Sequence, residues 1–168
     1  MEAYFDNSAT TVPCREAVAA VNNALTESWG NPSSLHRRGV NAEELLVSSR
    51  ETVASALGCS HGEVYFTSGG TESNNLALFG AAYAGRRRGK RIISTSIEHP
   101  SVDETLNRLE AEGFEVIRLR VDSNGKMSPE ELYRAVNQNT VLLSIMLVNN
   151  EVGSIQPVEA ARLRGRWS

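Results

Sequence analysis

The sequence predicts an α/β fold in which helices flank a mainly parallel sheet. From residue 64 onward, short apolar runs alternate with stretches of helical periodicity, an order typical of parallel strand–helix–strand units. The run at residues 141–148 is almost entirely apolar, which predicts a fully buried central strand. With 168 residues, of which 40% are apolar, the chain is large enough to bury a core.

The first 58 residues are predicted to form a loop followed by helices. Ala17, Val18, Val21 and Leu25 recur at three- and four-residue spacing, which indicates an amphipathic helix. Turn-forming residues at 30–34 end this pattern, and a second helix is expected over residues 40–57, closed by Gly58 as its C-terminal cap. We therefore expect three regions: this segment at 1–58, a partial α/β domain at 59–158 and an atypical basic tail at 159–168.

The elements of the α/β region follow from the same periodicities. Strands are expected at residues 64–66, 91–95, 114–119 and 141–148. Helices are expected at residues 74–84, at 102–112 with Gly113 behind them, and at 129–136. Ser128, Pro129 and Glu131 form a capping-box pattern with proline at the first helical position, which places the start of the last helix.

Composition excludes several classes of function. A formal charge of -3 argues against general nucleic-acid affinity. No stretch approaches the ~20 apolar residues of a membrane span, and the first residues lack the layout of a signal peptide, so a cytoplasmic protein is expected. Cys14 and Cys59 form no metal or redox motif.

The sharpest local signal is the sequence TSGGTESNN at residues 67–75, between an expected strand and helix. Paired glycines let the backbone approach an anion, and the helix that follows presents unpaired N–H groups. Ser68, Thr71 and Ser73 add hydroxyl donors. The pattern predicts a phosphate site, and the alternative is a tight turn with an ordinary helix cap.

Two further motifs follow expected strands. His99 lies directly behind the strand at 91–95, where an imidazole can stack on a planar ring or move a proton; the alternative is a loop or capping histidine. Asn149 and Asn150 end the apolar run and could donate amide hydrogen bonds to a ligand oxygen, or simply form a turn. We expect the glycine turn, His99 and Asn150 to meet at one edge of the sheet, because the carboxyl ends of parallel strands share an edge.

Together these motifs resemble those of cysteine desulfurases, the NifS-like members of the class V aminotransferase group. The resemblance rests on DNSATT at residues 6–11, GNPSS at 30–34, TSGGTESNN at 67–75, EH at 98–99 and VNNEVG at 148–153. Their order and spacing agree with the family from about residue 4 to residue 158.

The resemblance implies a pyridoxal 5′-phosphate enzyme of fold type I, here as a partial large domain of that transferase fold. Such enzymes remove sulfur from L-cysteine, leave L-alanine and hold the sulfur as a persulfide for iron–sulfur clusters and other acceptors. Gly70 and Thr71 would hold the cofactor phosphate, His99 would stack on the ring and serve in proton transfer, and Asn150 would bond the ring hydroxyl oxygen. A homodimer and a sulfur-accepting scaffold protein are the partners it implies.

The chain departs from the family chiefly in length, because members have roughly four hundred residues. The Schiff-base lysine, the aspartate of the ring nitrogen and the persulfide cysteine have no counterpart here, since Lys90, Lys126, Cys14 and Cys59 match none of these positions. We therefore expect a truncated N-terminal portion that is inactive by itself. Position 70, often alanine in relatives, is a mild departure.

Several explanations of the truncated sequence stay open. The chain could be a fragment, one part of a split enzyme that pairs with a complementary half, or a product of a stop or frame change near Ala160, where a basic tail begins. A non-catalytic relative that only binds phosphate or a full-length partner subunit is the alternative function. A generic nucleotide-binding domain is disfavoured because its glycine fingerprints are absent.

Overall fold

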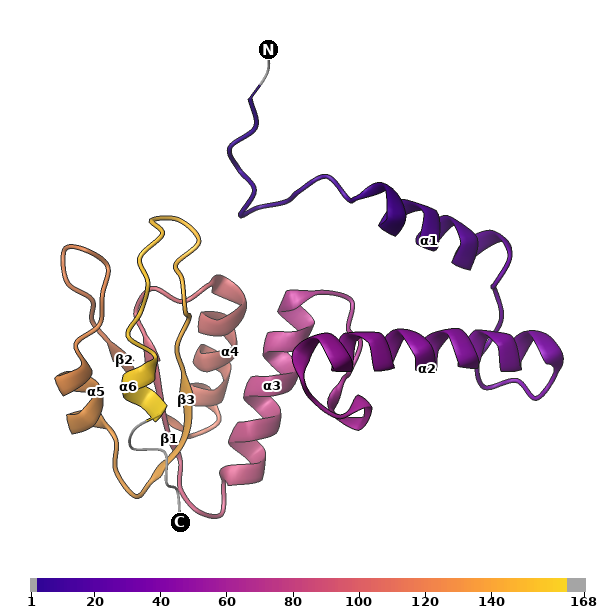
Figure 1. Ribbon diagram of the computed structural model, residues 1–168. Coiled ribbons are helices and arrows are strands. Elements are labelled where there is room, and N and C mark those ends of the chain that lie inside the picture. Colours follow the sequence, from indigo (N-terminus) through magenta and orange to yellow (C-terminus); the bar gives the residue numbers. More distant parts are fainter. Residues whose placement is uncertain (1–2, 163–168) are drawn as a thin grey trace. The chain divides into compact units, whose positions relative to one another are not determined.

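The computed structural model describes residues 3–162 (Figure 1) and divides the chain into two compact units, Met1–Phe66 and Thr67–Ser168. We call them the helical unit and the sheet unit. The boundary predicted between residues 58 and 59 stays a prediction. The part of the basic tail at residues 163–168 lies outside the described residues, whereas its first residues form the short helix α6 (Glu159–Arg162).

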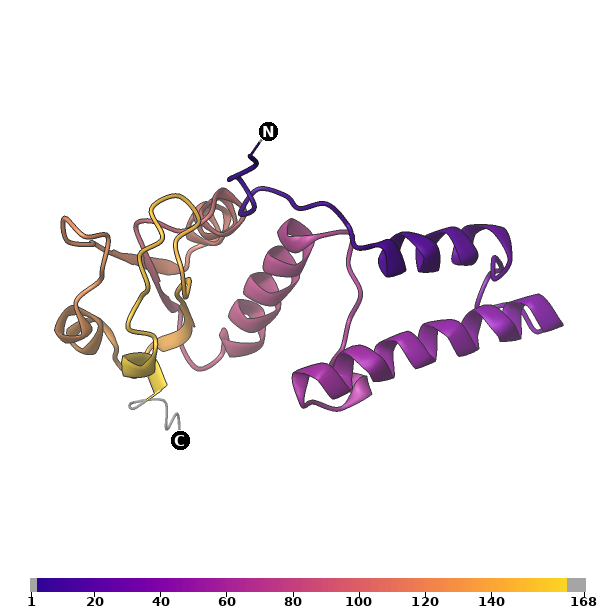
Figure 2. The same ribbon diagram turned by 45° about the horizontal axis from the view of Figure 1, so that its top comes forward.

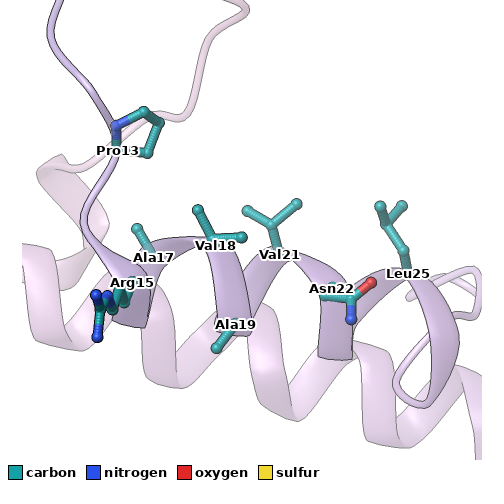
Figure 3. Close-up of a pocket in the computed structure, with 8 residues that line it drawn as sticks. All are labelled: Pro13, Arg15, Ala17, Val18, Ala19, Val21, Asn22 and Leu25. Atoms are coloured by element: carbon teal, nitrogen blue, oxygen red, sulfur yellow. The ribbon is translucent and has the colours of Figure 1, made fainter.

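The helical unit consists of α1 (Arg15–Thr26), α2 (Arg37–Leu57) and a short 3-10 turn, His61–Glu63. Both helices were predicted, and Gly58 closes α2 in the left-handed conformation with φ 68°, as expected of a C-terminal glycine cap. The apolar stripe predicted for α1 is exposed: Val18, Val21 and Leu25, 54%, 59% and 72% exposed, project from the same side of the helix (Figure 3).

The strand predicted at residues 64–66 is absent. Val64 is extended, but no strand within residues 3–162 pairs with this segment, and the Val64 carbonyl instead accepts a hydrogen bond from Arg50 Nε at 3.2 Å. Val64, Tyr65 and Phe66 have the side chains that favour a strand. A strand also requires backbone hydrogen bonds to a neighbouring strand, and in the described structure this segment lacks them.

Over residues 67–162, the sheet unit contains three parallel strands in the order β2-β1-β3: β1 (Arg91–Thr95), β2 (Glu115–Leu119) and β3 (Thr140–Ser144). The register aligns Arg91 with Glu115 on one side, and Ile92 with Leu142 on the other. β1 is the central strand. The strands predicted at 91–95 and 114–119 are confirmed, and so is the parallel α/β architecture.

The prediction of a fully buried central strand at residues 141–148 is wrong. β3 stops at Ser144 and lies at an edge of the described sheet, with most of its side chains only half-buried. Beyond it, Val148 pairs in an antiparallel bridge with Ile155, so this part of the apolar run enters a loop. An unbroken apolar run fits several environments, and periodicity alone does not separate them.

Helices cover both faces of this sheet. α3 (Gly70–Gly85) and α4 (Pro100–Ala111) pack on one face, and α5 (Pro129–Ala135) packs on the other, as Figures 1 and 2 show. Because side chains alternate along a strand, Ile92 joins the core under α3 and α4, whereas Ile93 joins the core with Leu132 of α5. Among residues 3–162, no helix combines the length and apolar character that a membrane crossing needs.

Candidate functional site

The predicted site residues lie at the edge of the sheet where the strands end. β1 and β3 are parallel neighbours, so their carboxyl ends share that edge. α3 and α4 also run parallel: Asn74 Nδ2 donates to Ser101 Oγ at 2.8 Å near their N-termini, and Tyr83 OH donates to Glu112 Oε2 at 2.7 Å near their C-termini. The N-termini of both helices, with their partial positive charge, therefore lie side by side (Figure 1).

The glycine turn leads directly into α3, with Gly69 as N-cap and Gly70 as the first helical residue. A Cβ built on either glycine would meet no atom within 4 Å, so the backbone is open on that side. The backbone N–H groups of the first turn have no acceptor inside a helix, because the carbonyls they would need precede it. This open, donor-rich turn can accept an anion.

Two of the three hydroxyls predicted as phosphate donors have other partners. Ser68 donates to Glu72 Oε2 from both its hydroxyl and its backbone nitrogen, each at 2.6 Å. These bonds from the Ser68 hydroxyl and N–H lower the pKa of the Glu72 carboxyl. Ser73 Oγ lies 2.6 Å from Thr67 Oγ1, which in turn donates to the Gly69 carbonyl. Ser68 and Ser73 thus shape the turn, and Thr71 is the hydroxyl left for a ligand within the described residues.

His99 is the N-cap of α4, so the structure shows the capping role that the sequence left open as an alternative for this residue. Its Nδ1 accepts from the Ser101 backbone nitrogen at 3.1 Å and lies 2.8 Å from Ser101 Oγ. Because a backbone N–H only donates, Nδ1 carries the lone pair, and the proton of the neutral ring lies on Nε2. The residue is exposed, and within the described part of the chain its Nε2 has no hydrogen-bond partner.

The two asparagines behind β3 differ in environment. Asn149 is only 8% exposed and donates from Nδ2 to the Ile97 carbonyl at 3.1 Å. Its Oδ1 accepts from the backbone nitrogens of Glu151 and Val152, both at 2.9 Å. Asn150 is exposed, and across residues 3–162 its amide makes no hydrogen bond. Asn149 therefore holds the loop, and the exposed amide of Asn150 stays unbonded among the described residues.

Sequence reasoning missed the residues that join these motifs. Glu98 Oε1 accepts from Thr95 Oγ1 at 2.7 Å and from the Met146 backbone nitrogen at 3.0 Å, so this carboxylate connects the ends of β1 and β3. Asn74 and Ser101 connect α3 to α4 in the same way. The signal available in the sequence was only that Asn74 and Glu98 lie inside two of the motifs and that Ser101 follows the second of them by two residues.

The unpartnered groups at this edge suit a phosphorylated planar ligand. The open first turn of α3 and the Thr71 hydroxyl match a phosphate, and the exposed imidazole of His99 and amide of Asn150 match an aromatic ring with a polar oxygen. Among the described residues, no group of histidine, cysteine or acidic side chains is arranged to hold a metal ion.

Comparisons with known proteins agree with this geometry. The protein-family model described as aminotransferase class-V matches residues 3–164. A NifS/IcsS protein homolog of Lactobacillus delbrueckii subsp. bulgaricus is 53% identical over 156 residues, which cover 93% of this chain and 40% of that protein. The cysteine desulfurase IscS of Methanosarcina thermophila is 49% identical, over 93% of this chain and 39% of its own.

Solved structures give the same result. A NifS-like protein superimposes with a TM-score of 0.92 at 43% identity and covers 97% of this chain. SspA in complex with cysteine superimposes with a TM-score of 0.85 at 36% identity. The match extends over 45% of each of those two chains, and the chain spans about 40% of the length of the curated relatives named above.

The predicted resemblance to NifS-like cysteine desulfurases is thereby confirmed. The fold prediction is confirmed as well, because these structural neighbours carry the fold type I architecture of pyridoxal-phosphate enzymes and the chain matches part of it. With a family match over residues 3–164 and relatives up to 53% identical, the chain belongs to the aminotransferase class V family.

Proposed function

We propose that this chain is the cofactor-binding portion of a pyridoxal-phosphate-dependent cysteine desulfurase. The enzyme would convert L-cysteine to L-alanine and pass the sulfur on as a persulfide for iron–sulfur cluster and other thio-cofactor assembly. The observation that carries the proposal is the meeting of the glycine turn, His99 and the Asn149–Asn150 loop at one sheet edge, held by the bonds of Asn74, Glu98 and Asn149.

The cofactor phosphate would be held at the start of α3. Gly70 and Thr71 would donate from their backbone N–H groups, and Thr71 also from its hydroxyl, while the helix dipole favours the negative charge. When bound, pyridoxal phosphate supplies an electron-withdrawing ring that stabilises negative charge developing on the substrate. The open space beside Gly70, where an added Cβ would meet no atom within 4 Å, supports this assignment.

His99 and Asn150 would bind the ring. The imidazole of His99 would stack on it, and Nε2, which carries the proton when the ring is neutral, would be the atom that takes part in proton transfer. The Asn150 amide would donate to the ring hydroxyl oxygen. Asn149 supports Asn150 indirectly, because its own amide fixes the loop that carries both residues.

We further propose that the 168-residue chain is inactive by itself and acts as a homodimer or with a complementary half, with a sulfur-accepting scaffold as a further partner in the cytoplasm. Its two lysines support this. Lys90 precedes β1 and so lies at the other end of that strand from His99. Lys126 lies in the turn whose backbone donates to Asp122. Neither matches the anchoring position of the family.

The phosphate assignment can be tested with a matched pair of variants at Gly70. Gly70→Ala keeps the N–H and its Cβ meets nothing, so cofactor affinity should be unchanged. Gly70→Pro removes the N–H at the first helical position, where proline is compatible with a helix. Loss of one hydrogen bond to a charged group should weaken binding about tenfold or more.

Titration of the purified chain with pyridoxal phosphate, followed by absorbance and by phosphorus NMR, measures this. The cofactor should bind the wild-type chain weakly and reversibly, and Gly70→Pro should bind it less well than Gly70→Ala at equal helix content. Equal affinity of the two variants would exclude the Gly70 N–H as a phosphate donor.

The alternative is a non-catalytic relative that binds only phosphate or a full-length partner. Mixing the chain with a separately expressed C-terminal portion of a relative distinguishes the two. Alanine formed from cysteine in the mixture would support the desulfurase. Binding of the cofactor or a full-length subunit without alanine from any such mixture would favour the alternative.

A further inference from the structure

We infer that Asn74 and Ser101 are positioning residues for His99: together they form a hydrogen-bond relay that runs from the first turns of α3 to the imidazole and fixes the tautomer of the neutral ring. The inference deepens the proposed function and rests on it, since it gives His99 a defined proton-carrying nitrogen at the proposed site.

The relay has two steps of the same length. Asn74 Nδ2 donates to Ser101 Oγ at 2.8 Å, and Ser101 Oγ lies 2.8 Å from His99 Nδ1. An amide nitrogen only donates, so the serine oxygen accepts from Asn74, and the single proton of the hydroxyl remains available for Nδ1. The Ser101 backbone nitrogen donates to the same Nδ1 at 3.1 Å. Both donors of Ser101 thus require a lone pair on Nδ1.

This arrangement exceeds what a helix cap requires. A cap needs one side-chain acceptor for a backbone N–H, and asparagine, aspartate, serine or threonine usually supplies it. Here a histidine caps α4, and two further side chains add bonds that satisfy no backbone group of that helix.

The middle of the relay is rigid, whereas its end is accessible. Ser101 is 9% exposed, and its carbonyl accepts from Thr105 Oγ1 at 2.9 Å in the packed part of α4. Asn74 is half-buried on α3. His99 is exposed, so the relay holds the ring from its Nδ1 side and leaves the Nε2–H facing away from that contact. The relay also links α3, which begins at the proposed phosphate site, to the imidazole of His99. It therefore fixes the position of the proposed ring contact relative to the proposed phosphate contact.

Long-range proton–nitrogen NMR of the histidine-labelled chain, recorded without cofactor at a pH where the ring is neutral, reads the tautomer of His99 directly. The wild type should be almost entirely the Nε2–H form. Ser101→Ala should raise the Nδ1–H to Nε2–H ratio about fivefold, the factor that corresponds to one net hydrogen bond. Ser101→Thr, which keeps a hydroxyl, should restore the wild-type ratio, and Asn74→Leu should shift it less than Ser101→Ala.

Thr105→Val is the matched control, because it removes only the hydrogen bond from Thr105 Oγ1 to the Ser101 carbonyl and leaves both donors of Ser101 to His99 Nδ1 in place. It should leave the tautomer ratio unchanged, which separates a relay effect from general loosening of α4. A wild-type chain mainly in the Nδ1–H form, or a Ser101→Ala chain that is folded and unchanged in tautomer, would overturn the inference. Failure of cofactor binding with the tautomer shifts intact would count against the proposed function and leave the relay standing.

Discussion

In the sheet unit, Ile92, Ile93 and Leu106 are completely buried, whereas in the helical unit Val18, Val21 and Leu25 are more than half exposed. Both sets belong to regular elements with the apolar periodicity expected of them. The same kind of apolar pattern is therefore buried in the sheet unit and exposed in α1 of the helical unit.

The difference has a structural cause. β1 presents alternate side chains to two faces, and each face meets a layer of helix: α3 and α4 on one, α5 on the other. Within residues 3–66 the helical unit contains no sheet, α1 has no buried residue, and Gly39 and Ala54 are the buried residues of α2. A helix with one apolar stripe is stabilised mainly by what packs on that stripe. We therefore expect the stability of the isolated chain to come from the sheet unit.

The largest expected effect is the contrast between one substitution made in each unit. Leu106→Ala removes a fully buried side chain and should lower the free energy of unfolding by about 2–5 kcal/mol. Leu25→Ala, at a position on the exposed side of α1 (Figure 3), should change it by less than about 0.5 kcal/mol. Urea denaturation followed by far-UV circular dichroism measures both. A cost for Leu25→Ala close to that of Leu106→Ala would mean that the face of α1 is covered in solution.

Most of the fold could be predicted because most of its signals are local. Gly58, Ser128 and Pro129 mark helix ends by their own conformational preferences, and each does so in the structure. The errors at residues 64–66 and 141–148 concern strand pairing, which depends on residues distant in the chain. β propensity at Val64 carries no information on whether a partner strand is present, and the apolar run at 141–148 carries none on where the sheet ends.

The candidate site follows the same rule. The motifs containing Gly70, His99 and Asn150 could be recognised in the sequence, and parallel topology predicted that they meet. Which polar groups stay free could not be predicted, because it depends on partners many residues away: Asn149 bonds Ile97, and Glu98 bonds Met146. Ser68, by contrast, donates to Glu72, which is only four residues away. The glycine pattern led us to predict Ser68 as a phosphate donor instead.

A smaller effect, of opposite sign in the two units, is expected from replacing glycine by alanine. Gly58 has φ 68°, so Gly58→Ala places a side chain in the left-handed region and should cost about 1–2 kcal/mol at the end of α2. Gly80 lies inside α3, where a Cβ would meet nothing, and Gly80→Ala should stabilise by about 0.5–1 kcal/mol. Amide hydrogen exchange of the two helices reports each change locally. Faster exchange in α3 of Gly80→Ala would contradict the open surroundings of that position.

The smallest expected effect is a pH dependence confined to the sheet unit. Arg91 bonds Glu115 twice, from Nη2 at 2.7 Å and from Nε at 2.8 Å, and these bonds lower the pKa of the Glu115 carboxyl. A carboxyl with a lowered folded pKa stabilises the fold above its unfolded pKa, and loses that contribution as the pH falls through the folded value. Glu115 is half-exposed, so the effect should be modest and should shrink with added salt.

Glu115→Gln should therefore flatten the acid limb of the stability curve of the sheet unit, as followed by denaturant midpoints at a series of acidic pH values. Glu63 of the helical unit is the control, because its carboxylate accepts from the Ser60 backbone nitrogen and, among residues 3–66, no ion pair is present. Glu63→Gln should leave the acid limb of the sheet unit unchanged. If both substitutions flattened the acid limb equally, the two units would unfold together. The inference that the stability of the chain comes from the sheet unit would then be wrong. If only Glu115→Gln flattened the acid limb, the loss of stability at acidic pH would come from the sheet unit, which contains both the Arg91–Glu115 ion pair and the buried core.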